Sequence, residues 1–540
     1  MEQNSLHSID YYILAAYFIL IFGIFIVLYL RDRKRGLDND SSAYFLGGRN
    51  LPWFIVGASL FASNIGSEHL VGLAGAGAAG DFPVAQFELL ASFMLLLLAW
   101  VFVPIYLRTG IFTMPQFLEK RFDNWSRTYL TWLSIIGYVL TKIALTIMAG
   151  GIIFTALLGI DFWLGATIVV VATGIYTLFG GLKAVVYTDM VQMFILLGSS
   201  IAITFIGLNH LGGWETLVQR AEPGYLSLWR GFDHPDFPWT GILFGAPILG
   251  IWYWCTDQFI VQRVLAARNL DQARKGSIFA AALKILPLFL FVIPGLIAYE
   301  LSKGPDALIS FPMENGKPLY DAALPLITMQ LLPAGLRGLV VAGLLAALMS
   351  SLSSVFNSCS TLITVDVYQR YFPEASEKKL VAVGRWSTAG LVVLGVAWIP
   401  MLQFLEGGLF QKLQSLQSYI SPPIAAVFLL GIFWKRLNAK GAKYALISGA
   451  VLGAARLILE LTKENWSGFL LWFAEINFLH FALLLFLISS GVLISVSYAS
   501  EAQPNGIKAK DPSGEKPSLL NIINSVIVVV LVLLLWWYFS

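Results

Sequence analysis

Charged residues are scarce in this sequence. Asp, Glu, Lys and Arg make up 12% of its 540 residues, whereas 57% of the residues are hydrophobic. Soluble globular domains carry about 25% charged residues, so the composition excludes a large soluble protein. Apolar stretches of about 20 residues, the length that crosses the roughly 30 Å hydrocarbon core of a bilayer, recur along nearly the whole chain. The sequence therefore predicts an all-α polytopic membrane protein.

Cysteine is also rare, and the signatures of common membrane enzymes are missing. The two cysteines, Cys255 and Cys359, fall inside predicted spans, which argues against a disulfide framework or a thiolate metal cluster. Walker A and HExxH sequences are absent, so an ATP-driven pump and a membrane zinc protease lack their core chemistry. The run Gly75–Gly80 matches the letters of a dinucleotide-binding fingerprint, but it follows no predicted strand, and we interpret it as a glycine-rich helix end. We expect no enzymatic activity, no cofactor, no nucleic-acid ligand and no required protein partner.

The apolar stretches predict 14 transmembrane helices. The expected spans are 9–30, one within 51–88, 83–107, 128–157, 162–179, 184–208, 240–261, 275–299, 337–368, 381–403, 409–433, 445–461, 470–496 and 519–539. The first lacks a basic start and a small-residue cleavage site, so we expect it to be retained rather than removed as a signal peptide. The last three are mostly apolar, and we interpret them as outer packing helices.

Lysine and arginine concentrate in alternate connections between these spans, for example at Arg31–Arg35 and Lys435–Lys443. We also assign the segment Arg263–Lys275 to such a connection. Because cytoplasmic loops carry an excess of Lys and Arg, this bias predicts that both termini are extracytoplasmic.

The second span is unusual because polar residues and glycines lie near its middle. Ser63, Asn64, Ser67, Glu68 and His69 stand there among Gly57, Gly66 and Gly72. In hydrocarbon, an interrupted helix persists only where its freed backbone groups face protein, water or a ligand. A freed carbonyl is an oxygen ligand for a hard cation, and broken helices near the membrane midplane form the ion and substrate sites of many secondary transporters. The stretch therefore predicts a broken helix with a functional site.

The seventh span predicts a second interruption. Gly245, Pro247 and Gly250 precede the run from Trp252 to Gln258, and a proline inside a helix removes a donor and clashes with the preceding turn. Two interrupted helices five spans apart indicate a 5+5 inverted-repeat core. We expect a peripheral helix and loop at 1–51, the first repeat at 52–209, an external linker at 210–237, the second repeat at 238–436 and peripheral helices at 437–540.

Ionisable residues within spans are costly and are functional hypotheses by default. Glu88, Lys142, Asp189 and Lys284 are such residues. The alternatives are structural ion pairs, for example Glu88 with Lys142, and helix capping by Asp189, which lies near the expected cytoplasmic start of its span. His69 could equally be a core histidine.

The ninth span carries small and hydroxyl residues on two adjacent stripes of one helix face. The first stripe contains Ala347, Ser351, Ser354 and Ser358, and the second contains Ser350, Ser353 and Asn357. The stripes favour either cation binding or the close approach of a neighbouring helix.

Several motifs together resemble the sodium/glucose cotransporters of the solute:sodium symporter family. They are Leu51-Pro-Trp53, Phe61-Ala-Ser-Asn-Ile-Gly-Ser67 with His69, Gly72-Leu-Ala-Gly75, Thr113-Met-Pro115, Gly180-Gly-Leu182 with Tyr187-Thr-Asp189, Trp252-Tyr-Trp-Cys-Thr-Asp-Gln258, Leu348-Met-Ser-Ser-Leu352 with Phe356-Asn-Ser358, and Pro422-Pro-Ile-Ala-Ala-Val-Phe-Leu-Leu430. The likeness runs from about Tyr44 to Arg436. It implies the inverted-repeat symporter fold of the APC/LeuT type.

The resemblance also implies site residues. The main sodium site falls on the carbonyls of Ala62, Ile65 and Ala347 and the hydroxyls of Ser350 and Ser351, and a second sodium on Ser353 with Asp189. Sugar contacts fall on Asn64, His69, Glu88, Tyr253, Trp254, Lys284 and Gln414, with Tyr253 also acting as the inner gate.

The resemblance implies sodium-coupled import of a hexose such as glucose or galactose, with two sodium ions per sugar. Leu89 stands where glucose carriers commonly have tryptophan, and Gln417 and Gly250 occupy variable lining positions. These departures leave a symporter for myo-inositol or another polyol as the alternative. The chain ends without the long cytoplasmic insertion of animal members, so we expect a bacterial inner-membrane protein. A sodium channel or a sugar sensor that does not transport is the alternative from another class.

Overall fold

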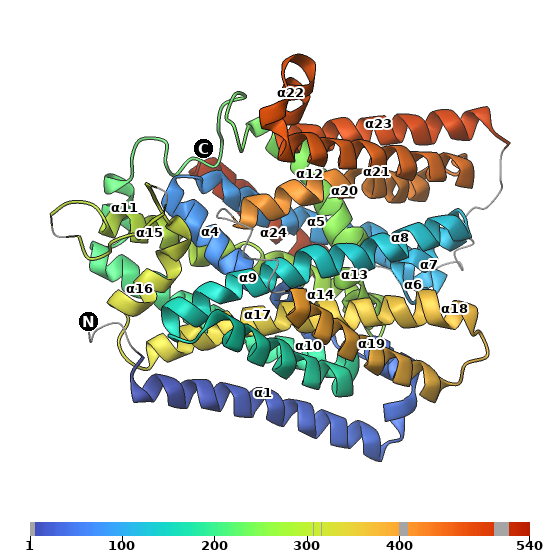
Figure 1. Ribbon diagram of the computed structural model, residues 1–540, viewed down its shortest axis with the longest axis horizontal. Coiled ribbons are helices and arrows are strands. Elements are labelled where there is room, and N and C mark those ends of the chain that lie inside the picture. The colour runs from blue at the N-terminus through green and yellow to red at the C-terminus, as the bar shows by residue number, and fades with distance from the viewer. Residues whose placement is uncertain (1–5, 306, 315, 399–408, 502–517) are drawn as a thin grey trace.

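The computed structural model describes residues 6–305, 307–314, 316–398, 409–501 and 518–540. Helices dominate these residues (Figure 1). The prediction of an all-α protein is correct apart from one antiparallel hairpin, β1 (Met313–Glu314) and β2 (Lys317–Pro318).

In the first half of the chain, two stretches, 82–109 and 124–157, run through several joined helical segments, and a third, 162–211, is one long helix. The helices of this half are α1 (Ser8–Lys34), α2 (Ser41–Leu46), α3 (Trp53–Asn64), α4 (Ser67–Ala79), α5 (Ala85–Leu97), α6 (Val103–Thr109), α7 (Met114–Arg121), α8 (Asn124–Gly137), α9 (Ala144–Ile152), α10 (Phe162–Leu211) and α11 (Trp214–Arg220). The short 3₁₀ segments are η2 (Leu37–Asn39), η3 (Gly47–Arg49) and η4 (Phe82–Val84). The π segments η5 (Leu98–Phe102) and η6 (Tyr138–Ile143) join neighbouring helices, and η7 (Ile153–Leu157) extends α9.

The second half has the same character. Its helices are α12 (Ala246–Gly250), α13 (Gln258–Leu265), α14 (Leu270–Leu283), α15 (Ile293–Leu301), α16 (Ala323–Leu331), α17 (Leu336–Thr361), α18 (Gln369–Tyr371), α19 (Glu377–Trp398), α20 (Leu409–Phe433), α21 (Ala439–Leu461), α22 (Gly468–Glu475), α23 (Phe478–Ala499) and α24 (Leu519–Tyr538). The π segments are η8 (Gly241–Gly245), η9 (Ile251–Thr256), η10 (Leu288–Val292) and η12 (Leu362–Tyr368), and the 3₁₀ segments are η11 (Tyr320–Ala322) and η14 (Lys463–Asn465).

Eleven helices of the described chain are long and apolar enough to cross a membrane, so the protein is a polytopic membrane protein. The expected thirteenth span is divided into α22 and α23, because Asn477 starts a new helix by accepting hydrogen bonds from the amides of Leu479 and His480. The expected end of the tenth span, Gln403, lies outside the described residues.

Helix α10 has 50 residues and is interrupted by a glycine. A straight helix of that length would be about 75 Å long, more than twice the hydrocarbon thickness. At Gly181 the backbone has φ 57° and ψ −161°, and a Cβ atom there would lie 2.4 Å from the carbonyl oxygen of Tyr44. Only glycine accommodates this conformation and this close approach.

The predicted break of the second span is confirmed. Helix α3 ends at Asn64 and α4 begins at Ser67, and Ile65 and Gly66 between them have non-helical dihedral angles. A Cβ atom on Gly66 would lie 2.2 Å from a carboxylate oxygen of Glu68. The carboxylate of Glu68 therefore folds back against the break.

The seventh span is also broken, but not at Pro247. The proline lies in α12 between two π segments, whose wider i→i+5 hydrogen-bond pattern tolerates its missing donor. The chain leaves helical geometry at Asp257, with φ −78° and ψ 129°, and the Asp257 side chain caps α13. The break therefore lies ten residues beyond the proline, where a short acidic side chain competes for the backbone donors.

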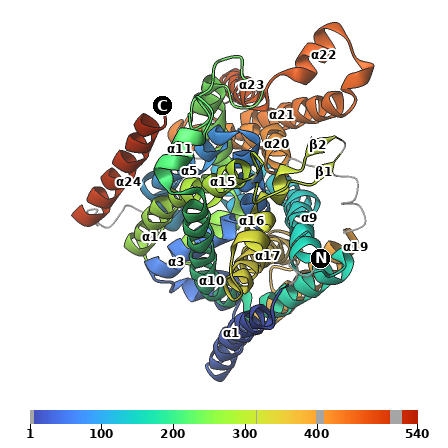
Figure 2. The same cartoon turned by 90° about the vertical axis from the view of Figure 1, so that its left-hand side faces the viewer.

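Helix α17 lies in the interior of the bundle, and α1 and α24 lie at its periphery (Figures 1 and 2). In its most apolar 18-residue window α17 is 94% buried, compared with 22% for α1 and α24. The start of α1 contacts the start of α17, where Asp10 accepts hydrogen bonds from the amides of Gly335 and Gly338. At the end of α24, the Phe539 carbonyl accepts a hydrogen bond from the amide of Leu228, which lies in the segment after α11. Both ends lie toward the same side of the bundle (Figure 1).

Candidate functional site

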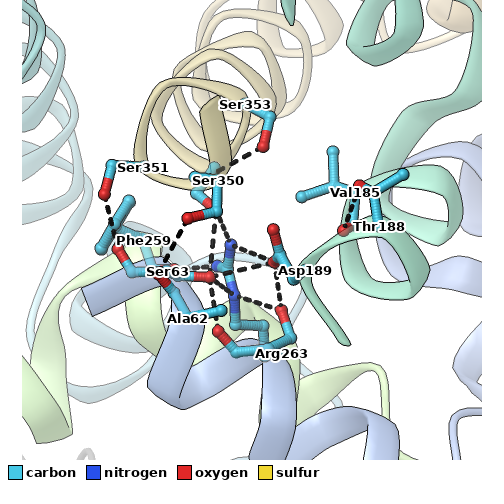
Figure 3. Close-up of polar contacts among 12 residues, drawn as sticks. Ala62, Ser63, Val185, Thr188, Asp189, Phe259, Arg263, Ser350, Ser351 and Ser353 are labelled. Atoms are coloured by element: carbon cyan, nitrogen blue, oxygen red, sulfur yellow. Dashed lines mark hydrogen bonds and ion pairs between the residues drawn. The ribbon is translucent and has the colours of Figure 1, made fainter. Parts of the chain in front are cut away.

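Serine hydroxyls of α17 face backbone carbonyls at the break between α3 and α4 (Figure 3). The hydroxyl of Ser350 lies 2.9 Å from the carbonyl oxygen of Ala62 and 3.0 Å from that of Ala347. The hydroxyl of Ser351 donates to the carbonyl of Ser63 at 3.2 Å. All of these groups are buried. The structure thus brings Ala62, Ala347, Ser350 and Ser351 together, and it places Ile65 at the break itself.

This cluster has the chemistry of a site for a hard monovalent cation. Its groups are uncharged oxygens from carbonyls and hydroxyls, which hard cations prefer, and it contains no sulfur or imidazole. The hydroxyls currently donate to the carbonyls, and a cation between them would be approached by the oxygen lone pairs of both. The donor set fits sodium.

Asp189 lies in the interior of the bundle, within α10 rather than at its end. It is fully buried in α10, and its Oδ2 accepts hydrogen bonds from Ser59 at 2.6 Å and Ser63 at 3.1 Å. The capping role considered for it is therefore wrong. Ser353 belongs to α17, which faces Asp189 across the cluster in Figure 3, and its hydroxyl donates to the Ser350 carbonyl at 3.0 Å.

Arg263 completes this cluster, although the charge pattern placed it in a cytoplasmic connection. Its side chain is fully buried in α13, and its Nε donates to the hydroxyls of Ser59 and Ser63 at 2.9 and 2.8 Å. Its guanidinium also donates to Ser354 and lies 3.8 Å from the Asp189 carboxylate. The signal that could have identified it was Asp189, because a buried carboxylate requires a compensating cation.

A cavity adjoins the break, and most of the expected sugar contacts line it. Its lining includes Asn64, His69, Glu88, Tyr253, Trp254 and Gln414. Lys284 lies behind this lining, where its ammonium pairs with the Glu88 carboxylate. The lining also includes Gln417 and Gly250, which were expected as variable lining positions, and Glu68 and Lys142, which were not expected as sugar contacts.

One hydrogen bond joins the two broken helices across this cavity. The side-chain amide of Asn64, the last residue of α3, donates to the Tyr253 hydroxyl at 2.9 Å. The Tyr253 ring packs edge-on against Trp254, with centroids 5.1 Å apart. The cavity therefore offers flat aromatic surface together with donors and acceptors, which are the groups that a sugar ring requires.

The buried charges of the cavity form two ion pairs. Glu88 pairs with Lys284, and Lys142 lies 3.6 Å from the Asp257 carboxylate. The alternative that paired Glu88 with Lys142 is therefore wrong. Glu68 lies 3.6 Å from the imidazole of His69.

A sequence model of the sodium:solute symporter family matches residues 44–449. The chain is 39% identical to sodium/glucose cotransporter 4 of Mus musculus over 535 residues, covering 93% of this chain and 77% of that protein. It is 43% identical to sodium/myo-inositol cotransporter 2 of Oryctolagus cuniculus over 485 residues, covering 85% of this chain and 71% of the relative.

A solved structure of a Na⁺-coupled sialic acid symporter in a substrate-bound outward-open state is also similar. The two chains are 22% identical, the TM-score is 0.78, and the match covers 92% of this chain and 99% of the other. This likeness shows a shared fold. With a broken helix facing a serine stripe, and a family match over three quarters of its length, the chain belongs to the sodium:solute symporter family.

Proposed function

We propose that this protein is a sodium-coupled secondary active symporter that imports a hexose such as glucose or galactose by alternating access. The observation that carries the proposal is the contact of Ser350 and Ser351 with the carbonyls of Ala62 and Ser63, directly beside the sugar cavity. The sodium/glucose cotransporters among its relatives support the choice of sugar and ion.

Sodium would bind between α17 and the break. The ligands would be the carbonyls of Ala62, Ile65 and Ala347 with the hydroxyls of Ser350 and Ser351. A second sodium would use Ser353 with Asp189. Sugar would contact Asn64, His69, Glu88, Tyr253, Trp254, Lys284 and Gln414, and Tyr253 would gate the exit to the cytoplasm.

Coupling follows from the position of Asn64, which lies at the end of α3 and lines the cavity. Sodium bridging α3 and α17 would order the break and hold Asn64 and His69 ready for sugar. Such coupling is reciprocal, so sugar should raise the affinity for sodium by the same factor.

We also propose 14 membrane crossings with a 5+5 inverted-repeat core at 52–209 and 238–436. The interruption of α10 at Gly181 supports two crossings there, and the shorter apolar helices Trp53–Asn64 and Gly241–Thr256 support one broken crossing each. The remaining segments would be the peripheral helix and loop of 1–51, the external linker 210–237 and the helices of 437–540. Both termini would be extracytoplasmic, in the plasma membrane of a bacterium.

Uptake of labelled D-glucose into proteoliposomes tests the symport function. Replacing sodium by choline should reduce uptake at least tenfold, and uptake should saturate with sugar. Uptake that is unchanged in choline would contradict the proposal. A channel would show no fixed ion-to-sugar ratio, and a sensor would not accumulate sugar.

A polyol is the second candidate substrate, because one relative that is 43% identical is a sodium/myo-inositol cotransporter. Competition between unlabelled D-glucose, D-galactose and myo-inositol against labelled D-glucose separates the two. A lower half-inhibitory concentration for myo-inositol than for D-glucose would show that the preferred substrate is a polyol and not a hexose.

A further inference from the structure

Lys142 occupies a box of aromatic rings beside the sugar cavity. Its ammonium nitrogen lies 3.5 Å from the ring centroid of Phe259, 4.3 Å from that of Tyr253 and 5.8 Å from that of Tyr138. The side chain is 12% exposed, and its ammonium has no hydrogen-bond partner within the described chain. The charge is therefore held by aromatic rings and one carboxylate at the cavity wall, a largely buried setting in which cation–π attraction is stronger than at an exposed site.

The carboxylate beside this ammonium is Asp257, where the second interrupted helix breaks. Its Oδ2 lies 3.6 Å from the Lys142 nitrogen. Its Oδ1 accepts hydrogen bonds from the Tyr138 hydroxyl and, at 3.1 Å, from the amide of Phe259. Lys142 thus neutralises the group that caps α13.

Tyr253 is fixed from two directions. The Lys142 ammonium lies near its ring, and the Asn64 side chain donates a hydrogen bond to its hydroxyl. The same ring is therefore attached to the first break through Asn64 and, through Lys142 and Asp257, to the second.

We propose that Lys142 is a positioning residue for the Tyr253 gate. Its ammonium is a tethered cation that holds the Tyr253 ring beside Asp257, and it keeps the gate closed while sugar is bound. The inference rests on the proposed symport function and adds a residue that does not itself bind sodium or transfer sugar. The ring can swing away from the cavity only when the ammonium leaves the box.

Leakage of sugar in the absence of sodium tests this role. Proteoliposomes loaded with labelled D-glucose are diluted into choline buffer, and efflux is compared with sodium-driven uptake. Lys142→Met should raise the efflux rate about tenfold, the value of one partly exposed cation–π contact, and reduce sodium-driven accumulation by a similar factor. Lys142→Arg should keep both rates within about threefold of the natural protein, because a guanidinium also stacks on aromatic faces.

The matched control is Lys275→Met. Lys275 also pairs with an aspartate, Asp271 at 2.7 Å, but on a partly exposed stretch of α14 away from the cavity. This variant should leave efflux and uptake unchanged. If the natural protein shows no sodium-driven uptake, the symport function fails. If it transports and the efflux of Lys142→Met equals that of Lys275→Met, only the role of Lys142 is overturned.

Two further measurements separate gating from a general effect on folding. Phe259→Leu removes one wall of the box and leaves both charges in place, so it should raise efflux about threefold. In Lys142→Ala, added ethylammonium should enter the vacated box from the cavity and return efflux toward the natural rate. Efflux at the natural rate in Phe259→Leu, or a leak in Lys142→Ala that ethylammonium leaves unchanged, would overturn the proposal.

Discussion

At the scale of single residues, six charged residues in the interior of the bundle form three ion pairs at separate places. Asp189 and Arg263 lie beside the serine cluster, Glu88 and Lys284 lie at the cavity wall, and Lys142 lies with Asp257. Removing one member of such a pair leaves an uncompensated charge at low dielectric, so the pair, rather than the single residue, is the unit that a substitution disturbs.

Outside the membrane, Asp81 is an acidic residue whose ionisation costs stability. It follows α4. Burial raises its pKa from 3.8 to about 6; the nearby Asp236 carboxylate adds to this increase, and the Arg230 guanidinium opposes it. Stability is therefore lost as the pH rises from about 4 to about 6, and the full cost is present above that range. We expect Asp81→Asn to increase the midpoint of thermal unfolding by a few degrees at pH 7.5, which corresponds to roughly 1–2 kcal/mol.

The same substitution should have a smaller effect at pH 5, because that pH lies midway through the range and only part of the cost is present there. Thermal unfolding in detergent, followed by intrinsic tryptophan fluorescence, measures both values. Glu464→Gln, at an exposed position in η14, is the control and should show no difference between the two pH values. An equal shift of Asp81→Asn at both pH values would contradict the explanation.

At the scale of elements, the site consists of a helix break against a helix face, and each contributes a different kind of oxygen. The break supplies carbonyls that have lost their helical partners, and α17 supplies hydroxyls at adjacent positions. Ser350→Ala removes one hydroxyl and leaves the Ala62 carbonyl without its partner. Loss of such a contact costs about 1–2 kcal/mol, so the sodium concentration for half-maximal uptake should rise about tenfold.

The apparent affinity for sugar at saturating sodium should stay within about twofold in this variant, because Ser350 does not line the cavity. Ser360→Ala is the matched control, since Ser360 lies on the same helix but donates to the Gly384 carbonyl. Initial rates of uptake over a sodium series measure these constants. If Ser350→Ala and Ser360→Ala show the same sodium dependence of uptake, Ser350 is not a sodium ligand.

The elements also show what the sequence can and cannot predict. The break at Ile65–Gly66 was predictable because glycines and polar side chains are both unfavourable in a lipid-exposed helix, and the bounds of α20 agree with the expected span 409–433. The second break was misplaced because π turns absorb Pro247. Asp189 indicates that a compensating cation lies nearby, but the identity of that cation and the partner of Lys142 could not be predicted, because pairing depends on the rotation of each helix in the bundle. Span composition does not fix that rotation.

At the scale of the whole molecule, transport is a conversion of ion gradients into a sugar gradient. A neutral sugar gains nothing from the membrane potential, so the steepness of accumulation reports the number of sodium ions that move with it. One elementary charge crossing 100 mV gains about 2.3 kcal/mol. With equal sodium on both sides and an inside-negative potential of about 30 mV, two sodium ions per sugar should give about tenfold accumulation, whereas one ion gives about threefold.

We propose that the second ion binds at Ser353 and Asp189, so the stoichiometry can be tested through one hydroxyl. We expect the natural protein to reach about tenfold accumulation under these conditions and Ser353→Ala to reach only about threefold, because the Asp189–Arg263 pair stays intact while one sodium ligand is lost. The sugar ratio at steady state is measured in proteoliposomes with a potassium diffusion potential, and Ser360→Ala again serves as control. Threefold accumulation by the natural protein would show that one sodium ion, and not two, moves with each sugar. Tenfold accumulation by Ser353→Ala would place the second ion elsewhere.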